Sequence, residues 1–387
     1  MASQILHKLL NEIVKENKYE NPSVAVNLVY YEGISYTSYV PYTVTITEVG
    51  KEDLHMFARV AIKKDAKQTA MFDLEHSMHM ELHKTYEDIQ NACDIPPEKK
   101  LVMPKLYGYN PKELEETIVV EDLQPKGFIP FNRLKCIDWK YAAKSVESLA
   151  KIHALSMAYR DNNPVEFNEF VKKANAQEDI YSGVADTAYK QRVEATLAVI
   201  SDQNKNKLKV YLNKVSAVSL YDIQKSYQRP VLCHGDYRPS NILHKVHKNG
   251  SLEVVPTSFH SIQSGSPLSD LLYFIFTGSD EQFRRRHFQA LMDHYYKELS
   301  NILRSLKLNP DYIYSKTNFE HDLKQYLPYG LIMAILFLPI VSEQDEKAPT
   351  VQRGHRGIEP VTQTKTGPWF KERINGIIND YLRWGLI

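Results

Sequence analysis

The pattern of hydrophobic and polar residues divides the chain into a strand-rich part and a helix-rich part. Residues 1–17 place apolar side chains at helical spacing and predict an amphipathic first helix. Residues 24–49 are dense in Val, Tyr, Thr and Ile and are interrupted by Gly33, which predicts strands joined by a turn. Residues 54–64 predict another strand, and the segments VMPKLYGYN and ETIVVEDL predict two more.

Helical spacing dominates elsewhere. Residues 70–90 predict a helix whose apolar face carries Phe72, Met78, Leu82 and Tyr86. Residues 141–160 predict a core helix with apolar residues at three- and four-residue steps, and residues 368–387 predict an amphipathic helix at the end of the chain. The apolar run at residues 330–341 is shorter than the roughly 18 residues of a membrane span and predicts a buried helix ending near Pro339.

The order of these elements predicts an α+β fold of two lobes. At 387 residues the chain exceeds the roughly 250 to 300 residues at which a single core stops growing. A turn-rich stretch follows Glu121 and Asp122, and there the character changes from strands to helices. We therefore expect a β-rich first lobe at residues 1–123 and a mainly helical second lobe at residues 124–387.

Charge and cysteine content narrow the classes of partner. The 48 Lys and Arg residues almost cancel the 47 Asp and Glu residues, so no overall field attracts nucleic acid or an anionic membrane. The three cysteines are far apart and lack metal-ligand spacing, which predicts neither disulfides nor zinc and favours a reducing compartment. With no apolar signal-peptide core near the start, these features predict a cytoplasmic location.

Residues 231–245 (VLCHGDYRPSNILHK) break the helical pattern and carry the clearest chemical signal. His234, Gly235 and Asp236 are followed five positions after Asp236 by Asn241. Phosphoryl transfer needs a carboxylate that receives or orients the proton of the attacking hydroxyl, and oxygen ligands that position magnesium. The hydrophobic flanks predict strand, catalytic loop and strand. The simpler alternative is a hairpin in which Asp236 only forms the turn.

The chain resembles the ecdysteroid kinase-like family, also called the choline-kinase-like (CHK) domain, whose relatives include choline and aminoglycoside kinases. The segment VLCHGDYRPSNIL matches the family's catalytic loop, in which HGD is followed by four residues and Asn. The resemblance extends to SGSPLSDLLYFIF, to TIVVEDL, to SLAKIHALS and to the C-terminal WFKERINGIINDYLRWGLI. It covers nearly the whole chain.

The resemblance implies roles for several residues, together with ATP and Mg²⁺ as cofactors. Asp236 would be the catalytic base, His234 would help to hold the loop, and Asn241 would bind magnesium. Asp270 would brace the catalytic loop. Glu81 would be the helix glutamate that pairs with a strand lysine gripping the ATP phosphates, or else a solvated helix residue.

The resemblance also implies the position of the nucleotide. The loop over the phosphates would begin at Gly33 and end at Ser38. The backbone of Glu121 and Leu123 would contact adenine.

Two positions depart from the family pattern. Ser258 lies seven residues before Gly265, where the family has an aspartate that binds magnesium, and a neutral hydroxyl is a poor ligand for this cation. Arg59 lies where the family has a phosphate-binding lysine, and its planar head does not replace lysine freely. Lys63 is about 13 Å further along the same strand and is too distant to substitute.

Other residues have plain structural interpretations. We expect His153 to be a packed core histidine and the basic run at residues 284–286 to be a solvated helix face. Three histidines share one helix at three- and four-residue spacing, but no family precedent supports a metal site there. These are His76, His79 and His83.

Two functional hypotheses remain open. The first is an ATP- and magnesium-dependent kinase acting on a hydroxyl of a steroid-like or other small hydrophobic molecule, with weakened activity. The second is a pseudokinase, a ligand-binding or regulatory protein that has lost turnover because of Arg59 and Ser258. A purely structural helical adaptor would leave the catalytic loop unexplained. The sequence identifies no protein partner.

Overall fold

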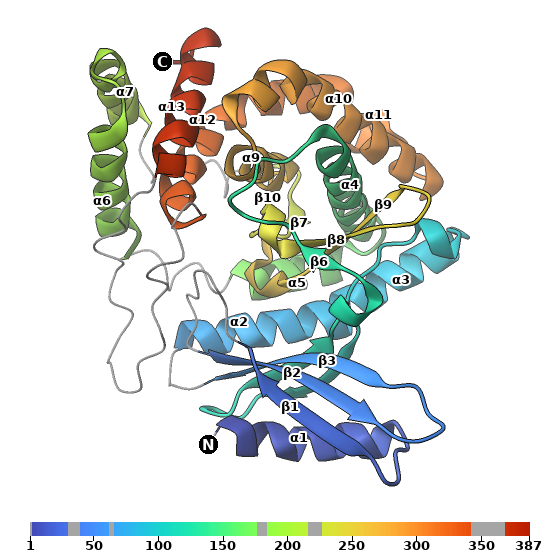
Figure 1. Cartoon of the computed structure of the whole chain (residues 1–387). Coiled ribbons are helices and arrows are strands. Elements are labelled where there is room, and N and C mark those ends of the chain that lie inside the picture. Colours follow the sequence, from blue (N-terminus) through green and yellow to red (C-terminus); the bar gives the residue numbers. More distant parts are fainter. Residues whose placement is uncertain (1, 30–38, 62–65, 176–183, 216–226, 342–367) are drawn as a thin grey trace.

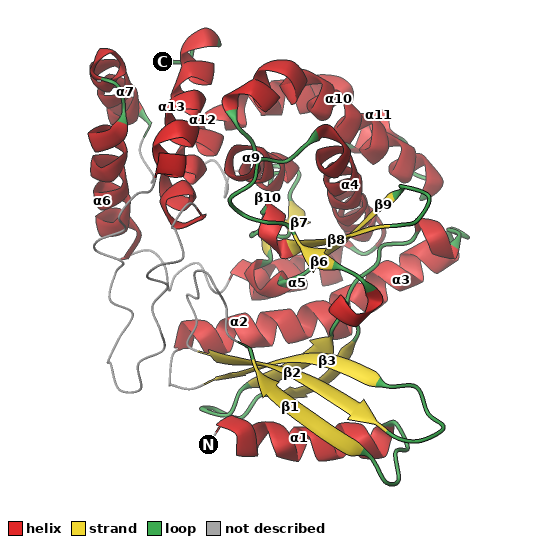
Figure 2. Cartoon of the chain, viewed as in Figure 1, coloured by secondary structure: helices red, strands yellow, loops and turns green. Residues whose placement is uncertain are grey.

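The computed structural model describes residues 2–29, 39–61, 66–175, 184–215, 227–341 and 368–387. A sheet-containing lobe and a larger helical lobe lie against each other (Figure 1). The large sheet lies in the first lobe, whereas most of the helices lie in the second (Figure 2). The predicted α+β fold of two lobes is confirmed. The division after residue 123 stays a prediction.

The first lobe is built on an antiparallel sheet with the strand order β1-β2-β3-β5-β4. The strands are β1 (Ser23–Leu28), β2 (Tyr39–Thr47), β3 (Leu54–Ala61), β4 (Leu106–Asn110) and β5 (Thr117–Glu121). Helix α1 (Ala2–Glu16) packs its apolar side chains against one face of this sheet. At Gly108 a Cβ would lie 3.1 Å from the Cδ1 atom of Ile13, so the glycine permits this close approach of helix and strand.

The helix predicted at residues 70–90 lies between the sheet and the second lobe (Figure 1). It consists of α2 (Ala66–Ser77), the π-helical turn η1 (Met78–Leu82) and α3 (His83–Ala92). The predicted apolar face is buried. Of this face, Met78, Leu82 and Tyr86 join the hydrophobic core of the helical lobe together with Leu74, and Phe72 is also buried.

Three short elements occur before the long helices of the second lobe. They are η2 (Pro97–Lys99), η3 (Gln124–Lys126) and β6 (Ile129–Pro130). The remaining helices are α4 (Trp139–Asn162), α5 (Pro164–Asn175), α6 (Val184–Val199), α7 (Asp202–Lys214), α9 (Pro267–Gly278), α10 (Glu281–Ser305), α11 (Pro310–Ile313), α12 (Lys316–Val341) and α13 (Pro368–Arg383).

Helix α9 lies in the middle of the helical lobe, and every one of its residues is buried. A helix that is hydrophobic nearly all round needs cover on all sides, and α4 and α12 are among the helices that provide it. Helix α12 extends to Val341 and contains Pro339, in agreement with the predicted buried helix. None of the helices in the described residues combines the length and the apolar character needed to cross a membrane.

One structural expectation for this lobe was wrong. Arg284 is 1% exposed and forms an ion pair with Asp380 of α13, whereas Arg285 and Arg286 are exposed. A solvated face was expected for all three arginines. Arg284 is buried because a carboxylate from a distant part of the sequence meets it inside the lobe.

Two small antiparallel sheets hold the candidate catalytic loop. Strand β7 (Val231–Cys233) pairs with β10 (Gln263–Gly265), and β8 (Ile242–Val246) pairs with β6 and with β9 (Leu252–Pro256). The catalytic loop connects β7 to β8 and ends in the turn η5 (Pro239–Asn241). A second connection, between β9 and β10, contains Ser258 and the turn η6 (Phe259–Ser261). The predicted order of strand, loop and strand is confirmed.

Candidate functional site

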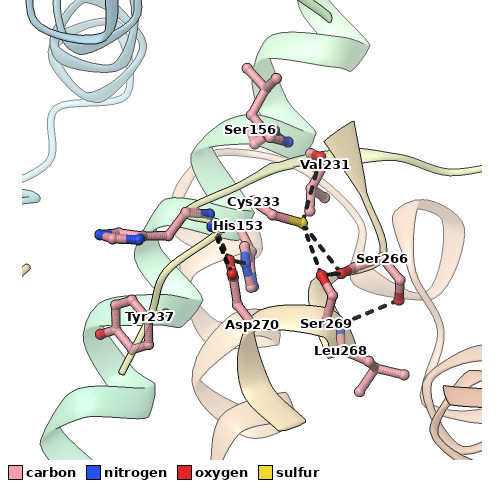
Figure 3. Close-up of polar contacts among 12 residues, drawn as sticks. His153, Ser156, Val231, Cys233, Tyr237, Ser266, Leu268, Ser269 and Asp270 are labelled. Carbon is pink, nitrogen blue, oxygen red and sulfur yellow. Dashed lines mark hydrogen bonds and ion pairs between the residues drawn. The ribbon is translucent and has the colours of Figure 1, made fainter. Parts of the chain in front are cut away.

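Asp270, in the first turn of α9, braces the catalytic loop. Its Oδ2 atom accepts a hydrogen bond from the backbone N–H of His234 at 2.6 Å, and its Oδ1 atom accepts one from Gly235 at 2.9 Å. The Nε2 atom of His153 lies 3.1 Å from Oδ2, and the other ring nitrogen lies 2.7 Å from the hydroxyl of Tyr295. The bracing role expected for Asp270 is confirmed, and His153 is a packed core histidine (Figure 3).

The bracing carboxylate is stabilised in its charged form. Burial alone would raise the pKa of Asp270, but the hydrogen bond and charge of His153 and the contacts with His234 and Gly235 outweigh it and lower the pKa. An ionised carboxylate accepts strong hydrogen bonds from backbone N–H groups. The catalytic loop is therefore fixed at two consecutive residues.

Cys233 lies beside this network, and its Sγ atom could join His153 and Asp270 around a metal ion. Each of the three side chains already has protein partners. The thiol lies 3.3 Å from the carbonyl oxygen of Ser266 and 3.4 Å from the hydroxyl of Ser269, and burial raises its pKa (Figure 3). We interpret the group as a structural network, because a metal would displace the bonds that brace the loop.

Gly235 brings the catalytic loop against η6. Its φ angle is +81°, and a Cβ built there would lie only 1.8 Å from the carbonyl oxygen of Ser261. Glycine alone tolerates both this left-handed conformation and this approach. The His234 ring strengthens the contact, since its Nε2 atom lies 2.9 Å from the carbonyl oxygen of Thr257. The loop and the segment that contains Ser258 are therefore packed together.

Two hydrogen bonds and one ion pair orient the side chain of Asp236. The hydroxyl of Tyr273 donates to Oδ1 at 2.9 Å, and the amide of Asn241 donates to Oδ2 at 2.7 Å. The Nε atom of Arg238 lies 3.3 Å from Oδ1. The Asp236 side chain remains 17% exposed, so a carboxylate of fixed orientation still reaches the surface.

Tyr273 and Arg238 were absent from the sequence-based site. A signal existed for Tyr273, because it follows Asp270 by three residues and therefore lies on the same face of α9. Arg238 is the one basic residue of the HGDYRPSN segment besides His234.

Arg59 of β3 pairs with Glu75 of α2, and both side chains are buried. The prediction that Glu81 is the partner of the cation at this strand position was wrong. The Glu81 side chain is 55% exposed and pairs with Lys173 of α5 at 2.6 Å. Glu75 had a signal in the sequence, since it lies midway between Phe72 and Met78 on the apolar face.

Two histidines surround this ion pair. Burial lowers the pKa of His260, in η6, and that of His79 to about 4, so both rings are neutral at pH 7. Burial alone would raise the pKa of Glu75, but the charge of Arg59 and further contributions outweigh it and lower the pKa. The pair therefore stays ionised inside the protein.

The expected magnesium site is incomplete. Ser258 adopts a left-handed conformation, with φ 67° and ψ 51°, and supplies a hydroxyl where the family has a carboxylate. The amide nitrogen of Asn241 is engaged by Asp236, which leaves the amide oxygen as a neutral ligand. Mg²⁺ in proteins is usually held by one or two carboxylates. The described residues at this position do not fit a standard magnesium site.

The described residues include only part of the predicted nucleotide site. The loop from Gly33 to Ser38, and Lys63, lie outside the described residues. The backbone N–H of Glu121 donates to Lys105 at 2.7 Å, and the carbonyl oxygen of Leu123 accepts from Lys126 at 3.1 Å. These contacts shape the connection between the lobes, and adenine binding there stays a prediction.

The three helix histidines do not form a metal group among the residues described here. His76 stacks on Tyr109 with ring centroids 4.0 Å apart, and His79 is buried beside Glu75. Packing explains these two side chains.

Comparison with known proteins agrees with this geometry. A model of the ecdysteroid kinase-like family matches residues 40–308. No curated protein sequence matches the chain.

Similar solved structures include an ethanolamine kinase of Plasmodium vivax, 10% identical, covering 94% of this chain and 83% of that one, with a TM-score of 0.45. An aminoglycoside 2′-phosphotransferase-IIIa in complex with GDP is 14% identical, covers 88% of this chain and 98% of that one, and has a TM-score of 0.42. These likenesses are weak, and the family assignment depends on the sequence match.

Proposed function

Because the chain belongs to the ecdysteroid kinase-like family, we propose that it transfers a phosphoryl group from ATP to a hydroxyl of a small hydrophobic molecule, with weakened turnover. One observation supports this proposal most directly. Tyr273 and Asn241 orient the carboxylate of Asp236, and Asp270 braces the loop that carries it. A kinase-like phosphotransferase fold needs such a carboxylate at its acceptor side.

In this mechanism Asp236 accepts the proton of the acceptor hydroxyl. The hydroxyl oxygen forms a bond to the transferred phosphorus while the bond from phosphorus to the leaving diphosphate breaks. Tyr273 and Asn241 keep the carboxylate in place, and Arg59, held by Glu75, is the cation for the phosphates. Magnesium takes no part in these steps, because Ser258 and Asn241 offer it only neutral oxygen ligands.

The weakened turnover follows from Ser258. Loss of one preorganised electrostatic group commonly lowers the rate by about 10² to 10³. Aspartate is among the residues that tolerate the left-handed conformation of Ser258, so Ser258→Asp should keep the local backbone. The double variant Ser258→Asp with Arg59→Lys restores both groups that the family uses.

The test is a labelled-phosphate assay of the purified chain with ATP, with and without Mg²⁺, on ecdysteroids and simpler hydrophobic alcohols. We expect slow transfer by the natural chain, faster transfer by the double variant, and none by Asp236→Asn. Equal transfer by the natural chain and Asp236→Asn would exclude the proposed role of Asp236.

A catalytically inactive pseudokinase is the second candidate. Two observations favour it: the missing carboxylate at Ser258 and the ion pair that Arg238 makes with Asp236. In a thermal-shift titration it would bind ATP without needing Mg²⁺, and neither the natural chain nor the double variant would transfer phosphate. A steroid-like acceptor and a cytoplasmic location both stay predictions.

A further inference from the structure

A stripe of apolar side chains on α12 runs past the residues that orient Asp236. It consists of Met333, Phe337 and Val341, which follow one another at four-residue steps and therefore share one face of the helix. Helix α12 packs against α9, which carries Tyr273. We call these three residues the α12 stripe.

Two contacts fix the position of the α12 stripe. The ring of Phe337 lies edge-on against that of Tyr273, with ring centroids 5.1 Å apart and an interplanar angle of 70°. The hydroxyl of Tyr273 donates to the carboxylate of Asp236 at 2.9 Å. One turn further along α12, Val341 and Ser240 of the turn η5 line the same small hollow. The stripe is therefore separated from the catalytic carboxylate by a single phenol side chain.

The middle of the α12 stripe is only partly buried. Met333 and Phe337 keep some exposed surface, although their neighbours Ala334, Ile335 and Leu338 are fully buried. A partly exposed apolar residue is ordinary on a protein surface. Phe337 differs in its position, because its ring touches the residue that holds the proposed catalytic base.

The stripe and the carboxylate together have the composition of a small-molecule site. Such sites combine apolar and aromatic walls with a few polar groups that fix the orientation of the ligand. The Asp236 side chain is 17% exposed and held in a fixed orientation, so it can accept the proton of one hydroxyl. The α12 stripe supplies an apolar surface one phenol ring away, where the carbon skeleton attached to that hydroxyl can pack.

We infer that Phe337 is a specificity-determining residue that contacts the carbon skeleton of the acceptor, and that the acceptor is a hydroxylated ring compound. Two physical reasons favour a ring over a flexible alkyl chain. An aromatic side chain gains contact energy from ring-on-ring packing, and a rigid ring loses less conformational freedom on binding. The inference rests on the proposed function, since it takes Asp236 as the base for the acceptor hydroxyl.

The first test is saturation-transfer NMR of the full chain, without ATP, with naphthalen-2-ylmethanol and undecan-1-ol as probes. Both are primary alcohols with the same number of carbon atoms, and the alkyl alcohol is the more hydrophobic of the two. We expect saturable binding of the ring alcohol and a higher affinity for it than for the alkyl alcohol. Equal or tighter binding of the alkyl alcohol, or no saturable binding of either probe, would overturn the inference.

Phe337→Leu is the decisive variant, because it removes the ring and keeps an apolar side chain. We expect the affinity for the ring alcohol to fall by about three- to tenfold and that for the alkyl alcohol to change little. Phe288→Leu is the matched control: Phe288 is a partly buried residue of α10, and its ring lies 4.9 Å from that of Trp384. Equal affinity of the two variants for the ring alcohol would contradict the inference. A fall in unfolding free energy of Phe337→Leu with unchanged affinity would show that Phe337 only packs within the protein.

The two proposals can fail separately. In the phosphate-transfer assay, Phe337→Leu should raise the KM for the ring alcohol and leave kcat and the KM for ATP nearly unchanged. Binding that depends on Phe337, without transfer by any variant, would remove the proposed function and keep Phe337 as a ligand contact. Transfer that is equal for both alcohols and unaffected by Phe337→Leu would keep the proposed function and exclude this role of Phe337.

Discussion

The catalytic loop and the connection that contains Ser258 pack against each other, yet they keep the chemistry of a kinase to different degrees. On the loop, Asp270 holds two backbone N–H groups, and Asp236 accepts two hydrogen bonds and forms an ion pair with Arg238. On the facing segment, Ser258 offers no charge to a metal. Asp270 is part of the buried structure, so its loss would disturb folding, whereas a carboxylate at Ser258 would serve only a ligand. The comparison separates residues that stabilise the fold of the site from residues whose only role would be to bind a ligand.

The largest effect on stability is expected for Asp270→Asn. The amide can no longer accept from His234, Gly235 and His153 in the same way, and a buried donor or acceptor loses its partner. We expect the free energy of unfolding to fall by about 4 kcal/mol, as measured by chemical denaturation. Asp293→Asn, at a half-exposed carboxylate on α10, is the control and should change little. Similar losses in both variants would contradict the bracing role.

A second test separates the loop from the facing segment at Gly235. Gly235→Ala combines a strained backbone with a clash against the carbonyl oxygen of Ser261, and should cost about 3 kcal/mol. Gly250→Ala has nearly the same φ angle, +77°, and no atom within 4 Å of the added methyl group, so about 1 kcal/mol is expected. The difference in unfolding free energy measures the contact. Equal costs would mean that the two segments are not packed as described.

The phosphate side can be tested through Glu75. Glu75→Gln removes the buried carboxylate that pairs with the guanidinium of Arg59 and should lower stability by about 2 kcal/mol. Glu81→Gln changes a mostly exposed carboxylate and should have little effect. Thermal and chemical denaturation of the two variants compare them directly. A larger effect at Glu81 would restore the partner first expected from the sequence.

The last test uses a dependence on pH. His260 has a folded pKa of about 4, whereas an unfolded histidine titrates near about 6.5. Between these values the unfolded chain binds a proton that the folded chain does not, so stability falls as the pH falls from 6.5 to 4, by up to about 1.4 kcal/mol per pH unit.

His260→Gln should reduce the slope of unfolding free energy against pH in that window, because the proton uptake of one histidine is removed. His7→Gln, at an exposed position on α1, is the control and should leave the slope unchanged. Parallel curves for His260→Gln and the natural chain would show that this ring does not titrate as described.

Much of the fold could be predicted from the sequence, because periodicity reports burial directly. The strand, loop and strand around Asp236 and the helix at residues 141–160 depend on local patterns. Asp270 was placed correctly because its motif has fixed spacing. These features need no knowledge of contacts between distant segments.

The errors arose where a charged residue is buried by a distant partner. Glu75 was missed because an apolar face was traced through hydrophobic residues alone, although a glutamate lay within it. Arg284 was assigned to the surface because its partner, Asp380, is 96 residues away. Burial of a charge depends on the partner that meets it, and a local pattern does not contain that partner.

The helix formed by α2, η1 and α3 makes the two lobes depend on each other. It precedes the lobe boundary in the sequence, yet Leu74, Met78, Leu82 and Tyr86 belong to the hydrophobic core of the helical lobe. Its Glu75 is tied to the sheet through Arg59. Removing the first lobe would expose part of the hydrophobic core of the second, so we expect the two lobes to unfold together in one cooperative transition.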